Sequence, residues 1–348
     1  PQDSMAKLVA IIAVVILAVV GQHICRFILA LNPFHHTYNH SPGPCQHVTG
    51  ITTGSEDLAL TSSGLVFVSS GPEDSHGKLF MIDLNSPDVE VSQVSIQPES
   101  FRDNFTAFGI SVYEDPASKE MRLFVVNVKS FEIETFRYDS STNTAHHIKT
   151  IKHPLITTPN DIVATGPDSF YVTNMSFFSN IICVALSLLT FLPVSSVTYY
   201  DNGEARTVAD GIKFANGINM SPDGQVIYVA SVLGRGIKVY RRQPDNSLEF
   251  KNDIMLYSNV DNVNVDPTSG SLWIGAHPSF WQAVGSKSPG SQVLQVKDAE
   301  SSNPIVTSIY ANNGEELSKS SAAVYHNGHL LIGTVSNKML HCKVNIPI

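Results

Sequence analysis

Four places in the sequence put a side-chain oxygen just before an alternating apolar stretch. These residues are Glu56, Asn160, Asn216 and Asp261, and Asn262 directly follows the last of them. Carboxylate and amide oxygens, with no histidine or cysteine among them, form the ligand set of a hard cation that accepts many oxygens, which is calcium. The pattern therefore predicts a calcium site, provided that the fold brings these positions together.

Two of the same segments carry a second acidic residue. Asp57 and Asp161 occupy the next position, and the backbone carbonyl of Ile110 falls at the following step of another segment. A second cation, deeper along the same axis, would neutralise them. Without metal, Glu56 and Asp261 would lie close to these two aspartates. The repulsion among the four carboxylates is costly unless a proton or a cation neutralises part of the charge. The alternative is that these are strand-end turn residues bonded to backbone.

The segments that must position these oxygens belong to a repeat of about 50 residues, roughly the length of a four-stranded propeller blade. Each unit has the alternation and turn residues of a β-hairpin. We therefore expect an all-β fold, a six-bladed β-propeller in which equivalent positions converge on a central calcium tunnel; a two-sheet sandwich or a solenoid is the alternative. The units begin at Glu56, Phe108, Asn160, Asn216, Asp261 and Ser320.

One apolar stretch interrupts the repeat between its third and fourth units. Residues 181–194 (IICVALSLLTFLPV) are nearly all apolar and contain little turn chemistry before Pro193. We expect a helix laid over one face of the propeller, as a lid or a membrane-contact surface. An extra buried strand is the alternative.

A second apolar run, residues 8–20, follows Lys7 near the start of the chain. Its length is that of a signal-peptide core and is short for a bilayer span. No clear cleavage site follows, so the segment is either a removed signal or an uncleaved anchor; a buried core helix is less favoured. The expected organisation is a hydrophobic signal or anchor segment at 1–24, a linker at 25–44 and the propeller at 45–348.

The four cysteines show no C-x-x-C spacing of the kind used for zinc or redox chemistry. Cys45 opens the folded region and Cys342 nearly ends it, so a disulfide between them would close the ring in an oxidising compartment. Two free buried thiols are the alternative. Cys25 and Cys183 remain, and we expect Cys183 to be unpaired in the apolar insert.

Four N-x-S/T sequons occur, and those at Asn39, Asn104 and Asn174 agree with the secretory pathway and are candidate glycosylation sites. We expect the fourth, at Asn219, to be buried and unmodified. We expect a protein that is secreted, or associated with a membrane through an uncleaved hydrophobic segment.

Composition excludes several classes of function. With 43% hydrophobic and 15% charged residues the chain is globular, and its net charge of −9 gives no footprint for nucleic acid. The sequence contains no G-x-S-x-G elbow, H-E-x-x-H motif, Walker sequence, EF-hand loop or dinucleotide fingerprint. A serine triad therefore loses its main sequence support.

From Met5 almost to the C-terminus, the sequence resembles the paraoxonase family of calcium-dependent lactonases and arylesterases. The resemblance implies a six-bladed propeller with two calcium ions, one at the catalytic mouth and one structural. It also implies a Cys45–Cys342 disulfide and a hydrophobic N-terminus retained for lipid attachment. The matching segments are GSEDL at Gly54, NDIVATGP at Asn160, FANGINMSPDG at Phe214, VDNVNVDPTSGSLWIGAHP at Val260 and LLIGTV at Leu330.

The resemblance also assigns ligands to the two ions. The catalytic calcium ligands it implies are Glu56, Asn160, Asn216, Asp261 and Asn262. The structural set it implies is Asp57, Asp161 and the carbonyl of Ile110.

The chain departs from the family where a base is needed. The family's histidine before the Gly-Ile-Ser of the second blade, and its partner in the Val-Val-Asn strand, are Phe108 and Val128 here. The family's Asp after Thr-Asn is Met175, and the Cys before the retained His277 is Ala276. A general base inherited from the histidine pair is therefore absent.

The leading hypothesis is a calcium-dependent hydrolase of small hydrophobic lactones and aryl esters, with a membrane or lipoprotein surface as a further partner. Calcium would polarise the carbonyl, and calcium-bound water would attack it. Glu56 would double as ligand and base, with His277 as the second choice of proton carrier. The alternative hypothesis is a non-catalytic, calcium-stabilised propeller that binds hydrophobic ligands or membranes, which the loss of the histidine pair favours.

Overall fold

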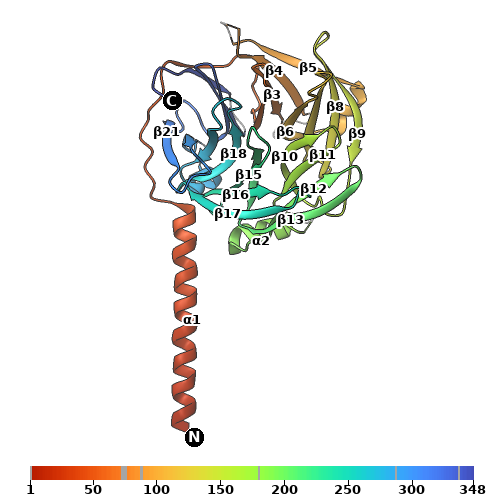
Figure 1. The fold of residues 1–348 in the computed structure, drawn as a ribbon. Coiled ribbons are helices and arrows are strands. Elements are labelled where there is room, and N and C mark those ends of the chain that lie inside the picture. Colours follow the sequence, from red (N-terminus) through yellow and green to blue (C-terminus); the bar gives the residue numbers. More distant parts are fainter. Residues whose placement is uncertain (1, 72–76, 87–88, 179–180, 287, 336–337) are drawn as a thin grey trace.

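The alternating apolar segments form strands, and the strands assemble as antiparallel meanders arranged in a ring (Figure 1). The computed structural model describes residues 2–71, 77–86, 89–178, 181–286, 288–335 and 338–348. Within these ranges there are four four-stranded sheets and one eight-stranded sheet. The architecture is therefore all-β and propeller-like, as the repeat predicts, with an apolar helix projecting from the ring.

The eight-stranded sheet is built from two antiparallel four-stranded halves. They join where residues 95–97 pair in parallel with residues 144–146. The first half contains β2 (Asp57–Leu60), β3 (Leu65–Ser70), β4 (Lys78–Asp83) and β5 (Val91–Gln97), and the second contains β6 (Ala107–Glu114), β7 (Met121–Asn127), β8 (Glu132–Asp139) and β9 (Thr144–Ile151). A short 3-10 helix, η1 (Glu99–Asn104), links the halves.

Three further sheets are simple meanders of consecutive strands. They are β10 (Pro159–Gly166), β11 (Ser169–Asn174), β12 (Ser195–Asp201) and β13 (Glu204–Ile212); β14 (Ala215–Met220), β15 (Val226–Ser231), β16 (Gly236–Arg242) and β17 (Leu248–Met255); and β18 (Asn259–Val265), β19 (Leu272–His277), β20 (Ser291–Lys297) and β21 (Ile305–Asn312). Buried apolar side chains of neighbouring sheets pack against each other, for example Tyr228 of β15 and Ile274 of β19 in one cluster.

The last sheet closes the ring with the two ends of the folded region. It consists of β22 (Ser320–His326), β23 (His329–Thr334), β24 (Leu340–Lys343) and β1 (Cys45–His47). Cys45 pairs with Cys342 in the β1–β24 register, and a disulfide joins the two. The predicted closure is confirmed. Cys25 is free and exposed, whereas the side chain of Cys183 lies outside the described residues.

The innermost strands follow one another around the ring. β2 lies beside β6, β6 beside β10, β10 beside β14, β14 beside β18, β18 beside β22, and β22 beside β2. Equivalent positions near the starts of these strands therefore face a common axis, as the repeat predicts.

The apolar N-terminal run is part of a helix, α1 (Gln2–Leu31), that is exposed along nearly its whole length. Residues 3–31 form a helix that is long and apolar enough to cross a membrane. The hydrophobic segment is therefore longer than the run of 8–20 indicates. The helix also continues past residue 24 into the range expected to be a linker. The end of the helix and the residue after it are tied to the ring, since the Asn259 amide donates to the carbonyl of Ala30 at 3.2 Å and the Asn32 amide to that of Pro278 at 2.8 Å.

The apolar insert is helical, as predicted, and forms α2 (Ile181–Thr190) rather than an extra strand. A third helix, α3 (Phe280–Gly285), follows β19 and was not anticipated from the sequence. In Figure 1, α2 lies on the side of the ring from which α1 projects. Residues of α1, α2 and α3 line one apolar pocket of 550 Å³, so the three helices gather on one side of the ring.

Candidate metal centre and active site

A β-bulge near the start of the innermost strands sets the geometry of the site. The register with the second strand slips between residues 159 and 162 in β10, 215 and 218 in β14, and 260 and 263 in β18. β6 and β22 slip in the same way. A bulge breaks the strict alternation of side chains. Consecutive residues such as Asp261 and Asn262 can therefore both serve one side of the sheet.

The bulge corrects the phase of the last repeat. In β22 the slip lies between Ser320 and Ala323, so Ser321, not Ser320, is equivalent to Asp261. Two adjacent serines made the phase ambiguous in the sequence. The hydroxyl of Ser321 donates to the carbonyl of Glu56 at 2.6 Å and so helps to hold the first inner strand against the last.

The residues predicted to bind the catalytic calcium are all buried at the strand starts. The side-chain amide of Asn262 donates to Glu56 Oε1 at 3.2 Å and to the Glu56 carbonyl at 3.1 Å. Asn160 and Asn216 lie on equivalent bulges of the adjacent strands β10 and β14. The relative exposures of the five residues are 1% for Glu56, 2% for Asn160, 7% for Asn216, 6% for Asp261 and 1% for Asn262.

Four of the predicted ligand oxygens are buried and lack a hydrogen-bond partner within the described residues. They are Glu56 Oε2, Asn160 Oδ1, Asn216 Oδ1 and Asn262 Oδ1. A buried polar atom left unsatisfied costs about 1–3 kcal/mol, so four acceptors gathered at the starts of the inner strands require a common electropositive partner. The donor set consists only of oxygens and fits Ca²⁺.

Amide oxygens are essential to this fit. Within the described ranges, no three His, Cys, Asp or Glu side chains gather in a way that could hold a metal ion. A cation here would depend on Asn160, Asn216 and Asn262 as well as on the carboxylates. Such neutral ligands lower the charge that the site must bury when it is empty.

Burial dominates the electrostatics of Glu56. It raises the pKa of Glu56 well above its ordinary value, and the neighbouring carboxylates of Asp57 and Asp261 raise it further. The hydrogen bond from Asn262 opposes the rise in pKa. A cation would reverse this balance, because it favours the ionised carboxylate.

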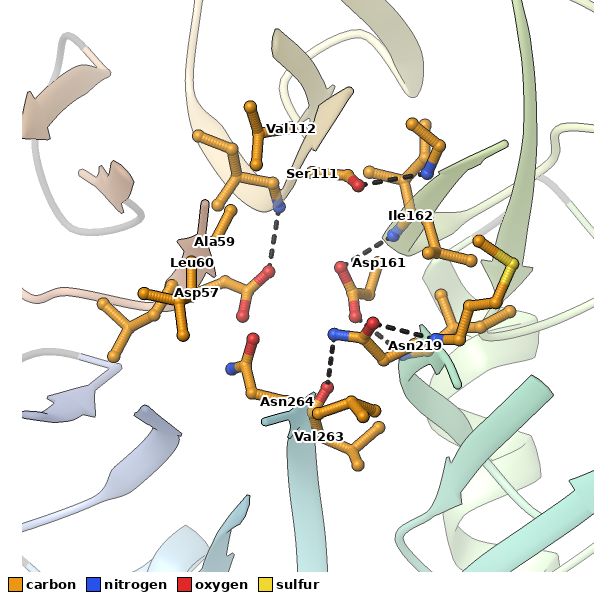
Figure 2. A pocket seen from close by; sticks show the side chains of 17 residues that line it. Asp57, Ala59, Leu60, Ser111, Val112, Asp161, Ile162, Asn219, Val263 and Asn264 are labelled. Atoms are coloured by element: carbon orange, nitrogen blue, oxygen red, sulfur yellow. Dashed lines mark hydrogen bonds between the residues drawn. The ribbon is translucent and has the colours of Figure 1, made fainter. Parts of the chain in front are cut away.

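A second cluster lies further along the tunnel and lines a cavity of 170 Å³. Figure 2 shows Asp57, Asp161, Asn219 and Asn264 pointing toward one another across it. The N–H of Ile110 donates to Asp57 Oδ2 at 2.9 Å. Ile110 therefore lies beside the predicted structural site, and the interaction that it makes there is through its N–H.

The two aspartates of this cavity are held by backbone donors. The N–H groups of Ile162 and Ile218 each donate to the Asp161 carboxylate at 2.7 Å. Burial nevertheless raises the pKa of Asp57 to about 6, against the lowering effect of the Ile110 hydrogen bond. Burial, followed by the charge of Asp57, raises the pKa of Asp161 well above its ordinary value. Two buried carboxyl groups that resist ionisation together are consistent with a second cation site.

Asn219 and Asn264 line this cavity but were missed in the sequence. They follow Asn216 and Asp261 by three residues, a spacing that strict alternation assigns to the opposite face. The bulge adds one residue and returns them to the face of the tunnel. A repeated oxygen-bearing residue at this spacing was the available signal.

His277 lies at the end of β19 beside the candidate ligand Asp261. Its Nε2 is 3.1 Å from Asp261 Oδ2. Its Nδ1 is buried and has no hydrogen-bond partner among the described residues. An ionised Asp261 accepts from Nε2–H and so leaves Nδ1 as the unprotonated nitrogen. His277 therefore has the arrangement of a base oriented by a carboxylate.

The positions of the missing histidine pair are apolar and partly buried. Phe108 and Val128 both pack against the cluster that contains Ile156 and Ile162. They are close in the fold, because Ala107 pairs with Asn127 and the Val128 N–H donates to the Thr106 carbonyl at 3.2 Å. No proton acceptor is present at either position.

One of the three predicted glycosylation sites is wrong. Asn39 and Asn104 are exposed. Asn174 is 1% exposed, and its amide nitrogen donates to the Leu155 carbonyl at 3.0 Å and to the Thr198 hydroxyl at 3.1 Å. A glycan would break these bonds and could not be buried. A sequon carries no information about burial.

Three comparisons place the chain among known proteins. A model of the arylesterase family matches residues 37–344. The chain is 36% identical to serum paraoxonase/arylesterase 1 of Homo sapiens, covering 98% of this chain and 100% of that relative. It is 32% identical to serum paraoxonase/lactonase 3 of Mus musculus, covering 97% and 99%. A gluconolactonase structure from Xanthomonas campestris matches with a TM-score of 0.55 at 15% identity, over 89% of this chain and 100% of that one, which shows the propeller-like fold alone.

Proposed function

The chain belongs to the arylesterase family, and from that premise we propose that it is a calcium-dependent hydrolase of lactones and aryl esters. The observation that carries the proposal is the set of four buried oxygens, on Glu56, Asn160, Asn216 and Asn262, that have no hydrogen-bond partner among the described residues. Asp261 completes the proposed ligand set. Because the chain belongs to the arylesterase family, a calcium site of this kind supports the hydrolysis of carboxylic esters.

We propose that the ring has six blades. The cyclic order of the inner strands supports this count when each half of the eight-stranded sheet is taken as one blade. The proposed propeller occupies residues 45–348, after the hydrophobic segment and a connecting stretch.

Two calcium ions would then occupy the tunnel. Glu56, Asn160, Asn216, Asp261 and Asn262 would hold the first, and Asp57, Asp161 and the carbonyl of Ile110 the second. The first ion, when bound, supplies a Lewis acid that polarises the ester carbonyl and stabilises developing negative charge on its oxygen. The crowding of Asp57 and Asp161 around one cavity supports the second.

The proposed base is His277. With Nε2–H donated to Asp261, its Nδ1 accepts a proton as water attacks the carbonyl carbon. The new C–O bond forms, and the C–O bond to the alcohol then breaks as His277 returns the proton to the leaving oxygen. Asp261 stabilises the transient imidazolium. The buried Nδ1, which has no partner in the described part of the chain, supports His277 ahead of Glu56, whose own free oxygen there is needed as a ligand.

Phe108 and Val128 would give the site an apolar wall in place of the family's base. Aromatic and aliphatic side chains favour the hydrocarbon part of a substrate. The preferred substrates are therefore hydrophobic lactones and aryl esters, and turnover is slower than in relatives that retain the histidine pair.

The second candidate function is a calcium-stabilised propeller that binds hydrophobic ligands or membranes without turnover. The apolar packing of Phe108 and Val128 favours it. Hydrolysis of a medium-chain lactone and of an aryl acetate, each with calcium and with chelator, decides between the two. Turnover that chelator abolishes supports the hydrolase; calcium binding without turnover of either substrate establishes the binding protein.

We further propose that the protein is secreted or held at a membrane or lipoprotein surface through α1. The exposed apolar helix and the gathering of α2 and α3 on its side of the ring support this placement. Glycans at Asn39 and Asn104 are compatible with it, since both residues are exposed.

A further inference from the structure

A groove of 620 Å³ lies where α1 meets the ring. One wall comes from the last turns of α1, including Arg26 and Leu29, and another from the segment after α2. The third comes from the strand ends around Lys213, Arg235 and Tyr257. The groove is separate from the tunnel, because it shares no lining residue with the cavity between Asp57 and Asp161.

The charge of this groove is opposite to that of the protein. The chain has a formal net charge of −9, yet the groove is lined by Arg26, Lys213 and Arg235 and by no described carboxylate. Asp253, the acidic residue nearest along β17, is paired with Lys238 at 3.0 Å. Three cations therefore face one space, and no described residue neutralises them there.

None of the three forms an ion pair within the described residues. Arg26 and Lys213 are exposed. Arg235 donates to the carbonyls of Leu29 and Tyr257, and its Nε is buried without a partner. Arg235 thus fixes the end of α1 against the ring while its own charge stays uncompensated.

The apolar part of the groove limits what kind of anion fits. Leu29, Leu192, Met255 and Tyr257 are exposed side chains that border the cations, and Tyr257 is 71% exposed. An exposed tyrosine beside aliphatic side chains is typical of the membrane–water interface. A cationic pocket with a hydrocarbon rim fits a ligand that has an anionic head and an apolar tail.

The position of Arg26 on α1 indicates how such a ligand would be oriented relative to a membrane. Residues 3–31 form an apolar helix that is able to cross or enter a bilayer, and Arg26 lies near its end, where the helix meets the ring. Lys and Arg at such a point lie at headgroup level, where each contributes about fivefold to the affinity for an anionic leaflet.

From these observations we infer that the groove formed by Arg26, Lys213 and Arg235 is a binding site for the headgroup of an anionic phospholipid. The inference rests on the membrane association proposed above and is independent of the hydrolase activity. The phosphate and its negative charge would lie among the three cations, and the acyl chains would follow α1 into the bilayer.

The test compares binding of the full-length protein to vesicles of phosphatidylcholine alone and of phosphatidylcholine with phosphatidylserine, by flotation. Wild type should prefer the anionic vesicles by at least tenfold at low salt. The preference should fall as salt is raised. The double variant Arg26→Glu with Lys213→Glu should lose most of this preference and still bind neutral vesicles through α1. Arg235 is left unchanged because it supports the fold.

The matched control reverses the same number of charges elsewhere. Arg241→Glu with Lys297→Glu changes residues at the C-terminal ends of the strands β16 and β20, and neither residue lines the groove. The groove residue Arg235 lies just before the other end of β16. This control should keep the preference. Equal losses in both doubles would mean that net charge alone acts, and would overturn the site.

Three other outcomes also decide the matter. Equal binding of wild type to both vesicles would overturn the headgroup site while leaving membrane association intact. Binding to neither vesicle would overturn both. Loss of the preference in 10 mM inorganic phosphate, but not in sodium chloride of equal ionic strength, would assign the groove to a soluble anion instead of a lipid.

Discussion

Asp261 Oδ2 lies 3.1 Å from His277 Nε2. Asn262, which follows Asp261 in the chain, donates a hydrogen bond from its side-chain amide to the carboxylate of Glu56. One bulge on β18 thus serves both halves of the proposed site, the cation ligands and the orientation of a histidine. The separation of these roles can be tested, because a residue that only transfers protons should not change calcium affinity.

His277→Gln should lower kcat for a lactone about 100-fold while leaving KM and calcium affinity nearly unchanged, since it removes a proton acceptor and no ligand. Glu56→Gln should weaken calcium binding and activity together. Steady-state kinetics with calcium titration separates the two patterns. His36→Gln, at an exposed residue of the segment before β1, is the control. An unaffected kcat in His277→Gln would make Glu56 the first choice of base again.

The ring itself was predictable because its signals are local. Alternation and turn residues define each hairpin, and the recurrence of hairpins at one spacing requires equivalent surroundings for each. The same recurrence predicts that Glu56, Asn160, Asn216 and Asp261 share one phase of the repeat. Cys45 and Cys342 could be paired because they lie at the two ends of the repeat.

The bulges were not predictable from that alternation, since a period of two cannot register an inserted residue. For this reason strict alternation assigns Asn219 and Asn264 to the face away from the tunnel, although the oxygen-bearing residue at this spacing is repeated. The two adjacent serines of the last repeat add a separate ambiguity, which indicates Ser320 in place of Ser321. The burial of Asn174 and the contact of Arg235 with α1 depend on tertiary structure. They join segments far apart in the chain and leave no local pattern.

Removal of calcium should destabilise the protein. Glu56, Asp57 and Asp161 are buried together, and burial opposes their ionised forms. A ligand present at 1,000 times its dissociation constant stabilises the native state by about 4 kcal/mol, and chelation should lower the melting temperature by roughly 10 °C. Asn216→Ala should reproduce much of the loss, whereas Asn303→Ala, at an exposed residue outside any sequon, should not. A melting temperature that chelator leaves unchanged would contradict the calcium proposal.

The closing sheet should be sensitive to acid through His341. Burial, aided by the charges of His329 and Lys343, lowers the pKa of His341 to about 4. The unfolded state takes up a proton near pH 6.5 and the native state does not. Stability from this group is therefore complete above pH 6.5 and is lost as the pH falls toward 4, by about 2 kcal/mol.

The measurement is urea unfolding of wild type and His341→Gln from pH 7.5 to 4 in saturating calcium. Acid also protonates calcium ligands in both proteins, so the difference between the two curves isolates His341. That difference should change between pH 6.5 and 4 and be constant above. A constant difference over the whole range would show that His341 does not report on acid stability.

Restoring the histidine pair tests whether Phe108 ended the family chemistry or redirected it. Phe108 and Val128 lie close together and pack on the same apolar cluster, so Phe108→His with Val128→His places two imidazoles at adjacent points of the second blade. A group that acts in the transition state should raise kcat, on the order of tenfold to a hundredfold, more than it changes KM. Lactone kinetics in saturating calcium provides the measurement.

Phe108→Ala with Val128→Ala is the control, because it opens the same space without a proton acceptor. If the alanine pair gains as much kcat as the histidine pair, the gain comes from room for the substrate and not from a base. If neither pair exceeds a wild type that is already fast, the proton acceptor is elsewhere. The triple variant that combines the restored pair with His277→Gln then decides between the two bases. Full activity in this variant means that the histidine pair can replace His277 as the proton acceptor. Inactivity means that proton transfer requires His277 even when the pair is present.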